Sequence, residues 1–146
     1  MKNSIFYALF ICITVFSVSS LTAQGTLQVT EGGTNINIGD TFDFGNVIVG
    51  LNQANTFVLD NTAGGGSPGR RLNGITVTIT GSTDFTPTNS NLGNLAGNGA
   101  PINHLITFTP SAVGLRTATV TITFSNGTND PYTFTIQGTG LALAQK

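Results

Sequence analysis

The chain has 146 residues, few charges and a formal net charge of −1. Charged residues make up 8% of it and hydrophobic residues 39%, which suits a folded chain and argues against disorder. Nucleic-acid binding needs clustered Lys and Arg. After the first 24 residues only Arg70 and Arg71 are adjacent basic residues, so we expect no nucleic acid as a partner.

The first 24 residues have the pattern of a secretory signal peptide. Lys2 precedes an apolar run from Ile5 to about Val18, and small residues follow. A charged start, a short apolar middle and a small-residue cleavage site are typical of such leaders, whereas a membrane-spanning helix needs about 20 apolar residues. We therefore expect residues 1–24 to form the leader, with cleavage after Ala23 or after Ser20, and no membrane span in the mature chain.

Cys12 is the only cysteine, and it lies inside the apolar run. Phe10 and Ile11 precede it where a lipoprotein signal has small residues, so we do not expect lipidation. The mature chain then has no disulfide and no cysteine-bound metal. Its roughly 120 residues, a common size for one domain, must be held together by their core alone.

Residues 117–140 predict a β-hairpin. Ala118, Val120, Ile122 and Phe124 alternate with threonines, and a similar alternation returns over 132–137. Successive side chains of a strand point to opposite faces, so each segment is expected to bury one face. The intervening residues contain Asn-Gly and a proline, which favour a turn.

Shorter alternating segments fill the rest of the domain, which we place at residues 25–140. They are separated by Gly, Asn and Pro, and no helical period follows the leader; they lie near 27–29, 36–38, 42–49, 55–60, 72–81 and 102–110. We predict an all-β, two-sheet antiparallel β-sandwich of seven to nine short strands, with a small barrel as the alternative. Residues 86–101 are expected to form a long polar loop, and residues 141–146 a C-terminal tail.

Several segments occur in an order that resembles a known family: FDFGNVIVG and TFVLDNT, then ITVTITGSTDFT, then ITFTPSAVGLRTATVTITFSN and YTFTIQGTG. Over residues 27–140 the chain resembles the choice-of-anchor D domain, an immunoglobulin-like module of the ASH and HYDIN type. Its most specific part is Phe108-Thr109-Pro110 followed by Gly114. The resemblance implies an immunoglobulin-like sandwich in a secreted or surface-displayed bacterial protein, and it supplies no site residues.

The sequence departs from that family pattern at two places. The loop over residues 63–71 is longer than the pattern, and no anchoring segment follows Gly140 within these 146 residues. The mode of surface retention therefore stays open, as does the possibility that the chain is a fragment of a larger surface protein.

Few residues offer catalytic chemistry. His104, the only histidine, shares a strand face with Ile102 and Ile106, which is typical of a structural histidine. Residues 65–69 match G-x-S-x-G around Ser67, but a nucleophile elbow needs a strand before the serine and a helix after it. We therefore predict no enzyme and no catalytic residues.

Metal and cofactor sites are equally unsupported by the sequence. Asp40 and Asp43 are close together, yet the spacing of a calcium loop is absent. Residues 64–69 lack the Lys-Ser or Lys-Thr of a phosphate-binding loop. We predict no metal-binding residues, no cofactor-binding residues and no cofactor.

These observations favour a secreted or extracellular structural or adhesive module, on or near the cell surface, that acts as a spacer or protein-interaction unit. The alternative is a ligand-binding module, with glycans as the first ligands to consider, that uses the polar loops at 52–55, 64–71 or 89–103. The protein or glycan partner is not identified. Because few Lys or Glu residues protect the strand edges, we also predict weak self-association or neighbouring modules in tandem.

The leader predicts a defined mature N-terminus. Protein recovered outside the host cell should begin at Gln24, or at Leu21 if cleavage follows Ser20, because small residues precede both bonds. Intact-mass spectrometry measures this start directly. Secreted protein that still begins at Met1 would contradict the predicted leader.

Overall fold

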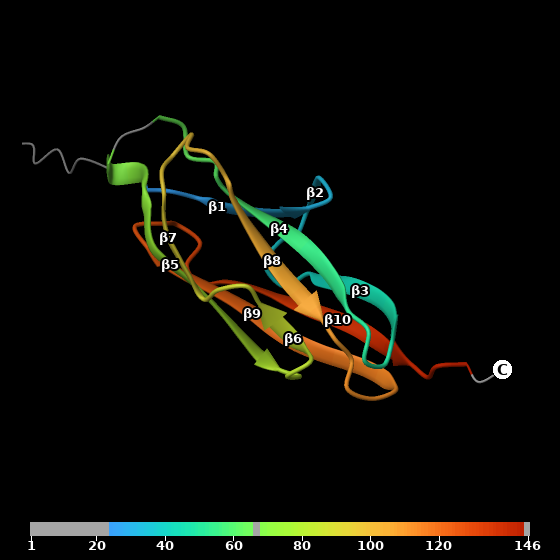
Figure 1. Ribbon diagram of the computed structural model, residues 1–146. Coiled ribbons are helices and arrows are strands. Elements are labelled where there is room, and N and C mark those ends of the chain that lie inside the picture. Colours follow the sequence, from blue (N-terminus) through green and yellow to red (C-terminus); the bar gives the residue numbers. More distant parts are fainter. Residues whose placement is uncertain (1–23, 66–67, 145–146) are drawn as a thin grey trace, which may run out of the picture.

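The computed structural model describes residues 24–65 and 68–144. They form ten strands and one short 3-10 helix, arranged as two five-stranded sheets (Figure 1). Residues 1–23 of the predicted signal peptide and Ser67 lie outside the described residues. Within the described ranges, no helix is long and apolar enough to cross a membrane.

The first sheet has the strand order β2-β1-β4-β8-β6, and all its neighbouring strands are antiparallel. The second has the order β3-β10-β9-β5-β7. The strands of the first sheet are β1 (Leu27–Glu31), β2 (Thr34–Asn35), β4 (Gln53–Asn61), β6 (Phe85–Pro87) and β8 (Ile102–Phe108). Those of the second are β3 (Thr41–Ile48), β5 (Leu72–Gly81), β7 (Asn91–Leu95), β9 (Gly114–Ser125) and β10 (Tyr132–Leu141), and the helix η1 spans Pro68–Arg70.

The predicted all-β two-sheet sandwich is confirmed, with two differences in detail. Strand β3 pairs with β10 in parallel, so the sheets are not wholly antiparallel. The strand count is ten rather than seven to nine, because residues 86–101 are not one loop: they contain the end of β6 and all of β7. Strand β7 pairs irregularly with β5 and bends at Gly93, whose φ is 77°, so it lacks the alternation that marks a strand in sequence.

The short strand expected near residues 36–38, after the Gly-Gly turn, is present but lies earlier in the chain. The structure places β2 at Thr34–Asn35 and leaves Ile38 half exposed. The backbone N–H of Asn37 donates a hydrogen bond to Asp40 Oδ2 over 2.7 Å. The N–H of Ile36 still donates to the Val29 carbonyl of β1 over 2.9 Å. The Asn37–Asp40 contact then turns the chain toward β3, so that the strand does not continue to Ile38.

The predicted hairpin is formed by β9 and β10. Tyr132 lies opposite Ile122, and the antiparallel register continues to Gly140 opposite Gly114. The buried apolar side chains of both strands face the other sheet, and the threonines of β9 face outward. The hairpin is interior, because β3 flanks one side and β5 the other.

Six phenylalanines join the two sheets, and we call them the phenylalanine cluster. Three come from the first sheet and three from the second; they are Phe57, Phe85 and Phe108, and Phe42, Phe44 and Phe134. Their ring centroids lie 4.7 to 6.2 Å apart, the range of favourable aromatic contact. A Cβ atom at Gly138 on β10 would lie 2.5 Å from the Phe108 ring, so glycine is needed for this packing.

One end of the sandwich is held by asparagine side chains. Asn61 is buried, and its Oδ1 accepts hydrogen bonds from the N–H groups of Thr26 (3.1 Å) and Ala63 (3.3 Å). Its Nδ2 donates to the carbonyls of Arg70 (2.6 Å) and Leu95 (3.1 Å). One side chain thereby joins four separate segments of the chain.

Asn129 and Asn126 extend this polar network from the hairpin turn. The amide of Asn129 pairs with both backbone groups of Leu27, accepting from its N–H over 3.0 Å and donating to its carbonyl over 2.7 Å. Asn126 Nδ2 donates to the carbonyls of Gly69 and Arg71. The turn of the hairpin is therefore tied to the start of β1 and to η1.

Asn61 should be important for stability. We expect Asn61→Ala to lower the free energy of unfolding by about 2–4 kcal/mol, since it leaves buried backbone groups without partners. Chemical denaturation measures the change. The control is Asn52→Ala in the exposed turn before β4, which should change stability by no more than about 0.5 kcal/mol; equal effects of the two substitutions would contradict the assigned role.

His104 should make stability depend on pH. It lies on β8 with 2% of its surface exposed, and no described group forms a hydrogen bond with its Nε2. Burial lowers its pKa from the ordinary value of 6.5. Below pH 6.5 the unfolded chain therefore binds a proton that the folded chain does not, and stability falls as the pH falls.

We expect the slope of unfolding free energy against pH to approach, at most, about 1.4 kcal/mol per pH unit from this one proton. Urea unfolding between about pH 7.5 and pH 5 measures the slope, above the range in which carboxylates ordinarily titrate. His104→Leu should flatten it. An unchanged slope in that variant would show that other groups cause the acid sensitivity.

Candidate ligand-binding groove

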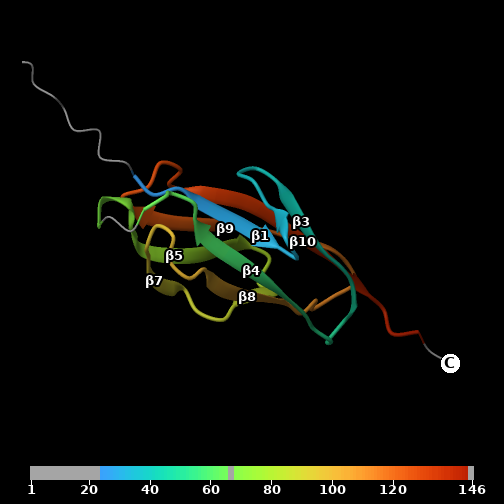
Figure 2. The same cartoon turned by 90° about the horizontal axis from the view of Figure 1, so that it is seen from above.

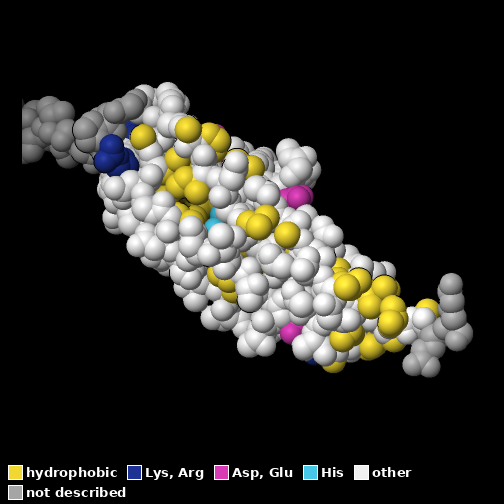
Figure 3. Space-filling view, in the orientation of Figure 1, with side chains coloured by type: hydrophobic (Ala, Val, Ile, Leu, Met, Phe, Trp, Pro, Cys, Tyr) yellow, Lys and Arg dark blue, Asp and Glu magenta, His cyan; other side chains and the backbone are white. Residues whose placement is uncertain are grey.

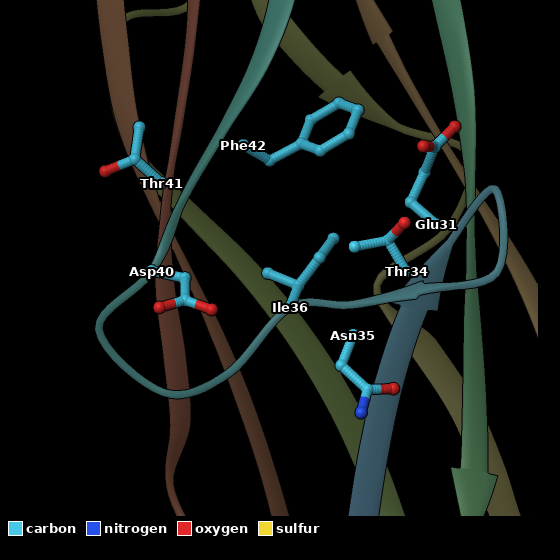
Figure 4. A pocket seen from close by; sticks show the side chains of 7 residues that line it. All are labelled: Glu31, Thr34, Asn35, Ile36, Asp40, Thr41 and Phe42. Atoms are coloured by element: carbon cyan, nitrogen blue, oxygen red, sulfur yellow. The ribbon is translucent and has the colours of Figure 1, made fainter.

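A groove opens between the edge strands β2 and β3, where the two sheets meet. It has a volume of about 380 Å³ and is lined by Glu31, Thr34, Asn35, Ile36, Asp40, Thr41 and Phe42 (Figure 4). Strand β2 has only two residues. The first sheet therefore covers little of this side, and the inward face of β3 can be reached from solvent.

The groove has an apolar part formed by Ile36 and Phe42. Ile36 is buried, whereas Phe42 is partly buried and packs by its edge against Phe44 and Phe57, with ring centroids 5.3 and 5.1 Å away. Phe42 thus belongs both to the groove and to the phenylalanine cluster. Its position is fixed by the core, so the groove does not require ordering before it binds a ligand.

Tyr132 holds the backbone beneath this apolar part. Its buried hydroxyl donates a hydrogen bond to the carbonyl of Ile36 over 2.6 Å. Burial raises the pKa of the Tyr132 hydroxyl above its usual 10, and the charge of Asp40 raises it further. The tyrosine is therefore a neutral donor at physiological pH, and it joins the hairpin to the groove.

Two carboxylates stand on opposite sides of the groove. Figure 4 shows Glu31 and Asp40 apart, with Ile36 between them. Glu31 Oε1 accepts a hydrogen bond from Asn55 Nδ2 over 2.9 Å, and Asp40 Oδ2 accepts two from Asn37. No described group donates to the other oxygen of either carboxylate, and neither Lys nor Arg lines the groove. The surface can accept hydrogen bonds from a ligand that also has an apolar face.

Two further pockets are more open to solvent than the groove. One of about 420 Å³ is lined in part by Asn37, Ile38 and Tyr132. The other, of about 410 Å³, lies between β5 and β6 and includes Ser90 and Asn91. Of the loops that the sequence suggested for ligand binding, the segment at 89–103 contributes to this last pocket, and none of the three lines the groove at β2 and β3.

The individual candidates from the sequence do not meet in one site. His104 is in the core, and Asp43 lies on the outer face of β3, where its carboxylate contacts Gln137 and the backbone of Gly45. Asp40 is in the turn before β3. Among the described residues, no three His, Cys, Asp or Glu side chains are placed to hold a metal ion.

Glu31 and Phe42 were not predicted to line one groove. Eleven positions separate them, and they belong to different sheets. Only the strand order brings β2 beside β3. The site is marked by an aromatic residue, Phe42, that is partly exposed on the inward face of an edge strand. That exposure can be recognised only in the folded structure.

No protein-family model matches the chain. No curated protein sequence matches it either. Among solved structures, a family 123 glycoside hydrolase from Clostridium perfringens, studied for glycolipid glycan hydrolysis, is similar with a TM-score of 0.61 at 14% identity. That likeness covers 83% of this chain and only 28% of the hydrolase.

Two single domains are similar over their full length. The ASH or PapD-like domain 7 of human CEP192 has a TM-score of 0.56 at 12% identity, with 94% of this chain and 100% of that domain covered. The N-terminal domain of PorA has a TM-score of 0.52 at 12% identity, covering 82% of this chain and 100% of that domain. The chain is thus an immunoglobulin-like, PapD-like β-sandwich module, and identities this low define the fold without assigning a function.

Proposed function

We propose that this chain is a secreted or cell-surface, non-enzymatic module of the choice-of-anchor D kind, acting as a spacer or protein-interaction unit. The leader-like residues 1–24 support export. The scarcity of side chains suited to catalysis supports a non-enzymatic role. His104, the only histidine, is buried and does not line the groove. The motif at residues 108–114, read on this fold, supports the family.

The path of the chain is the observation that carries this proposal. The first described residues lie at one end of the elongated sandwich, and the chain leaves at the opposite end after β10 (Figures 1 and 2). Such a module separates whatever is attached at its two ends by its own length. A spacer in a surface protein needs this geometry, and a domain with both ends on one side would not supply it.

Cell fractionation of the native host tests the proposal. An antibody against the folded domain should detect the protein in the medium or on intact cells, because export exposes it to the outside. The same blot gives the apparent mass: a small soluble species indicates a free secreted module, and a large cell-bound species indicates a module of a longer protein. Protein confined to the cytosol would contradict both forms of the proposal.

A second candidate function is ligand binding at the groove, and glycans are the first ligands to test. The specific observation is the combination of Phe42 with the carboxylates of Glu31 and Asp40. Sugars present an apolar ring face and hydroxyl donors, which an aromatic ring and carboxylate oxygens can contact. The absence of tryptophan from the sequence leaves Phe42 as the groove's aromatic surface.

A glycan array with paired variants tests this second function. Binding by the native protein should be lost in Glu31→Gln, because the neutral amide is a weaker acceptor than the carboxylate. Asp60→Asn is the matched control, as Asp60 is an acidic residue of β4 outside the groove lining. An array without any bound glycan, or equal loss in both variants, would count against glycan binding at the groove.

A further inference from the structure

Exposed apolar side chains gather at the end of the sandwich where the chain leaves β10. Five of the seven large hydrophobic residues that are exposed in the described structure lie there, with 39 to 71% of their surface accessible: Leu51, Val113, Leu115, Leu141 and Leu143. We call this surface the apolar end. Figure 3 shows hydrophobic side chains concentrated around the C-terminal end of the molecule.

Backbone contacts hold the loops of the apolar end in place. The N–H of Gly50 donates to the carbonyl of Pro110 over 3.1 Å, and the N–H of Val49 donates to the carbonyl of Leu141 over 2.9 Å. Gly140 packs so closely on the Ala112 carbonyl that a Cβ atom there would overlap it. Because the turns before β4 and β9 are fixed to β10, binding at this surface requires little ordering.

The apolar end carries no charge. Residues 48–52, 109–115 and 141–144 contain no Asp, Glu, Lys or Arg. Among the residues that the structure describes, the nearest charge in sequence is that of Arg116, directly after Leu115, and its Nε atom lies 3.2 Å from Asp84 Oδ2. The Nε–H is not aligned for a hydrogen bond, so this contact is an ion pair only. The surface therefore has the composition of an interface core, which is depleted in charge.

We propose that the apolar end is a docking surface for a second copy of this chain, which forms a two-fold, end-to-end dimer. Two-fold symmetry brings a patch against its own copy. A charged patch would then repel itself, whereas this uncharged one does not. The opposite end carries Arg70, Arg71 and the asparagine network, so head-to-tail contact would cover apolar side chains with polar ones.

This surface differs from the strand edges that the sequence suggested for self-association. Edge pairing would use the backbone of β2, β3, β6 or β7, whereas the apolar end lies at the turns. A two-fold contact uses up the patch on both copies, so assembly stops at the dimer. Edge pairing or head-to-tail contact leaves an open surface on each added copy and continues to larger species.

Analytical ultracentrifugation of the purified protein from about 10 μM to about 1 mM, a range that covers weak dimers, tests the proposal. The mean mass should rise with concentration and level off at twice the monomer mass. Leu115→Thr should raise the dimer dissociation constant at least about tenfold, as truncation of a central interface side chain does. Threonine already occupies the neighbouring outward positions of β9, so the variant should fold, and circular dichroism verifies this.

Leu105→Thr is the matched control. Leu105 is also an exposed leucine on the outer face of a strand, 38% accessible, and lies on β8 outside the apolar end. Its substitution should leave dimerisation unchanged. A protein that stays monomeric at about 1 mM, a mass that passes the dimer, or equal weakening by both substitutions would overturn the proposal. Binding to uncharged phosphatidylcholine vesicles that Leu115→Thr abolishes would also overturn it, in favour of a lipid surface as occupant.

Discussion

The fold depends on the contact between two sheets through the phenylalanine cluster. Each sheet of a sandwich has one apolar face that must be covered, and here each covers the other. Phe57 of the first sheet contacts both Phe42 and Phe134 of the second across the interface. Each aromatic side chain buries a large apolar area, and contacts between rings add to the stability that this burial provides. No disulfide is present in the described residues, whose sequence contains no cysteine.

The same cluster accounts for the position of the groove. Phe42 is the outermost of the six rings, because β3 is an edge strand and β2 covers it only in part. Its inner neighbours Phe44 and Phe57 are buried. The groove is therefore the place where the core reaches the surface, and its shape follows from the length of β2. Unlike the groove, the two ends of the sandwich are covered by other parts of the chain. Asparagine side chains cover one end, and turns with apolar residues cover the other.

The central strands could be predicted from the sequence, and the edges could not. Val120, Ile122 and Phe134 alternate strictly with polar residues, since one face of the hairpin is buried along its whole length. Strand β7 shows no such pattern because Gly93 bends it and only Leu95 is fully buried. The parallel pairing of β3 with β10 depends on strand order, which alternation does not encode. For the same reason the groove between β2 and β3 could not be predicted from the sequence.

The central claim is that the two sheets fold as one unit because the phenylalanine cluster joins them. Native-state hydrogen exchange measured by NMR tests it most directly, since it reports an opening free energy for each amide. The amides of β4 and β8 in one sheet and of β9 and β10 in the other should exchange with the same free energy, that of global unfolding. If the amides of one sheet exchanged at a clearly lower free energy than those of the other, the sheets would open separately and the claim would be wrong.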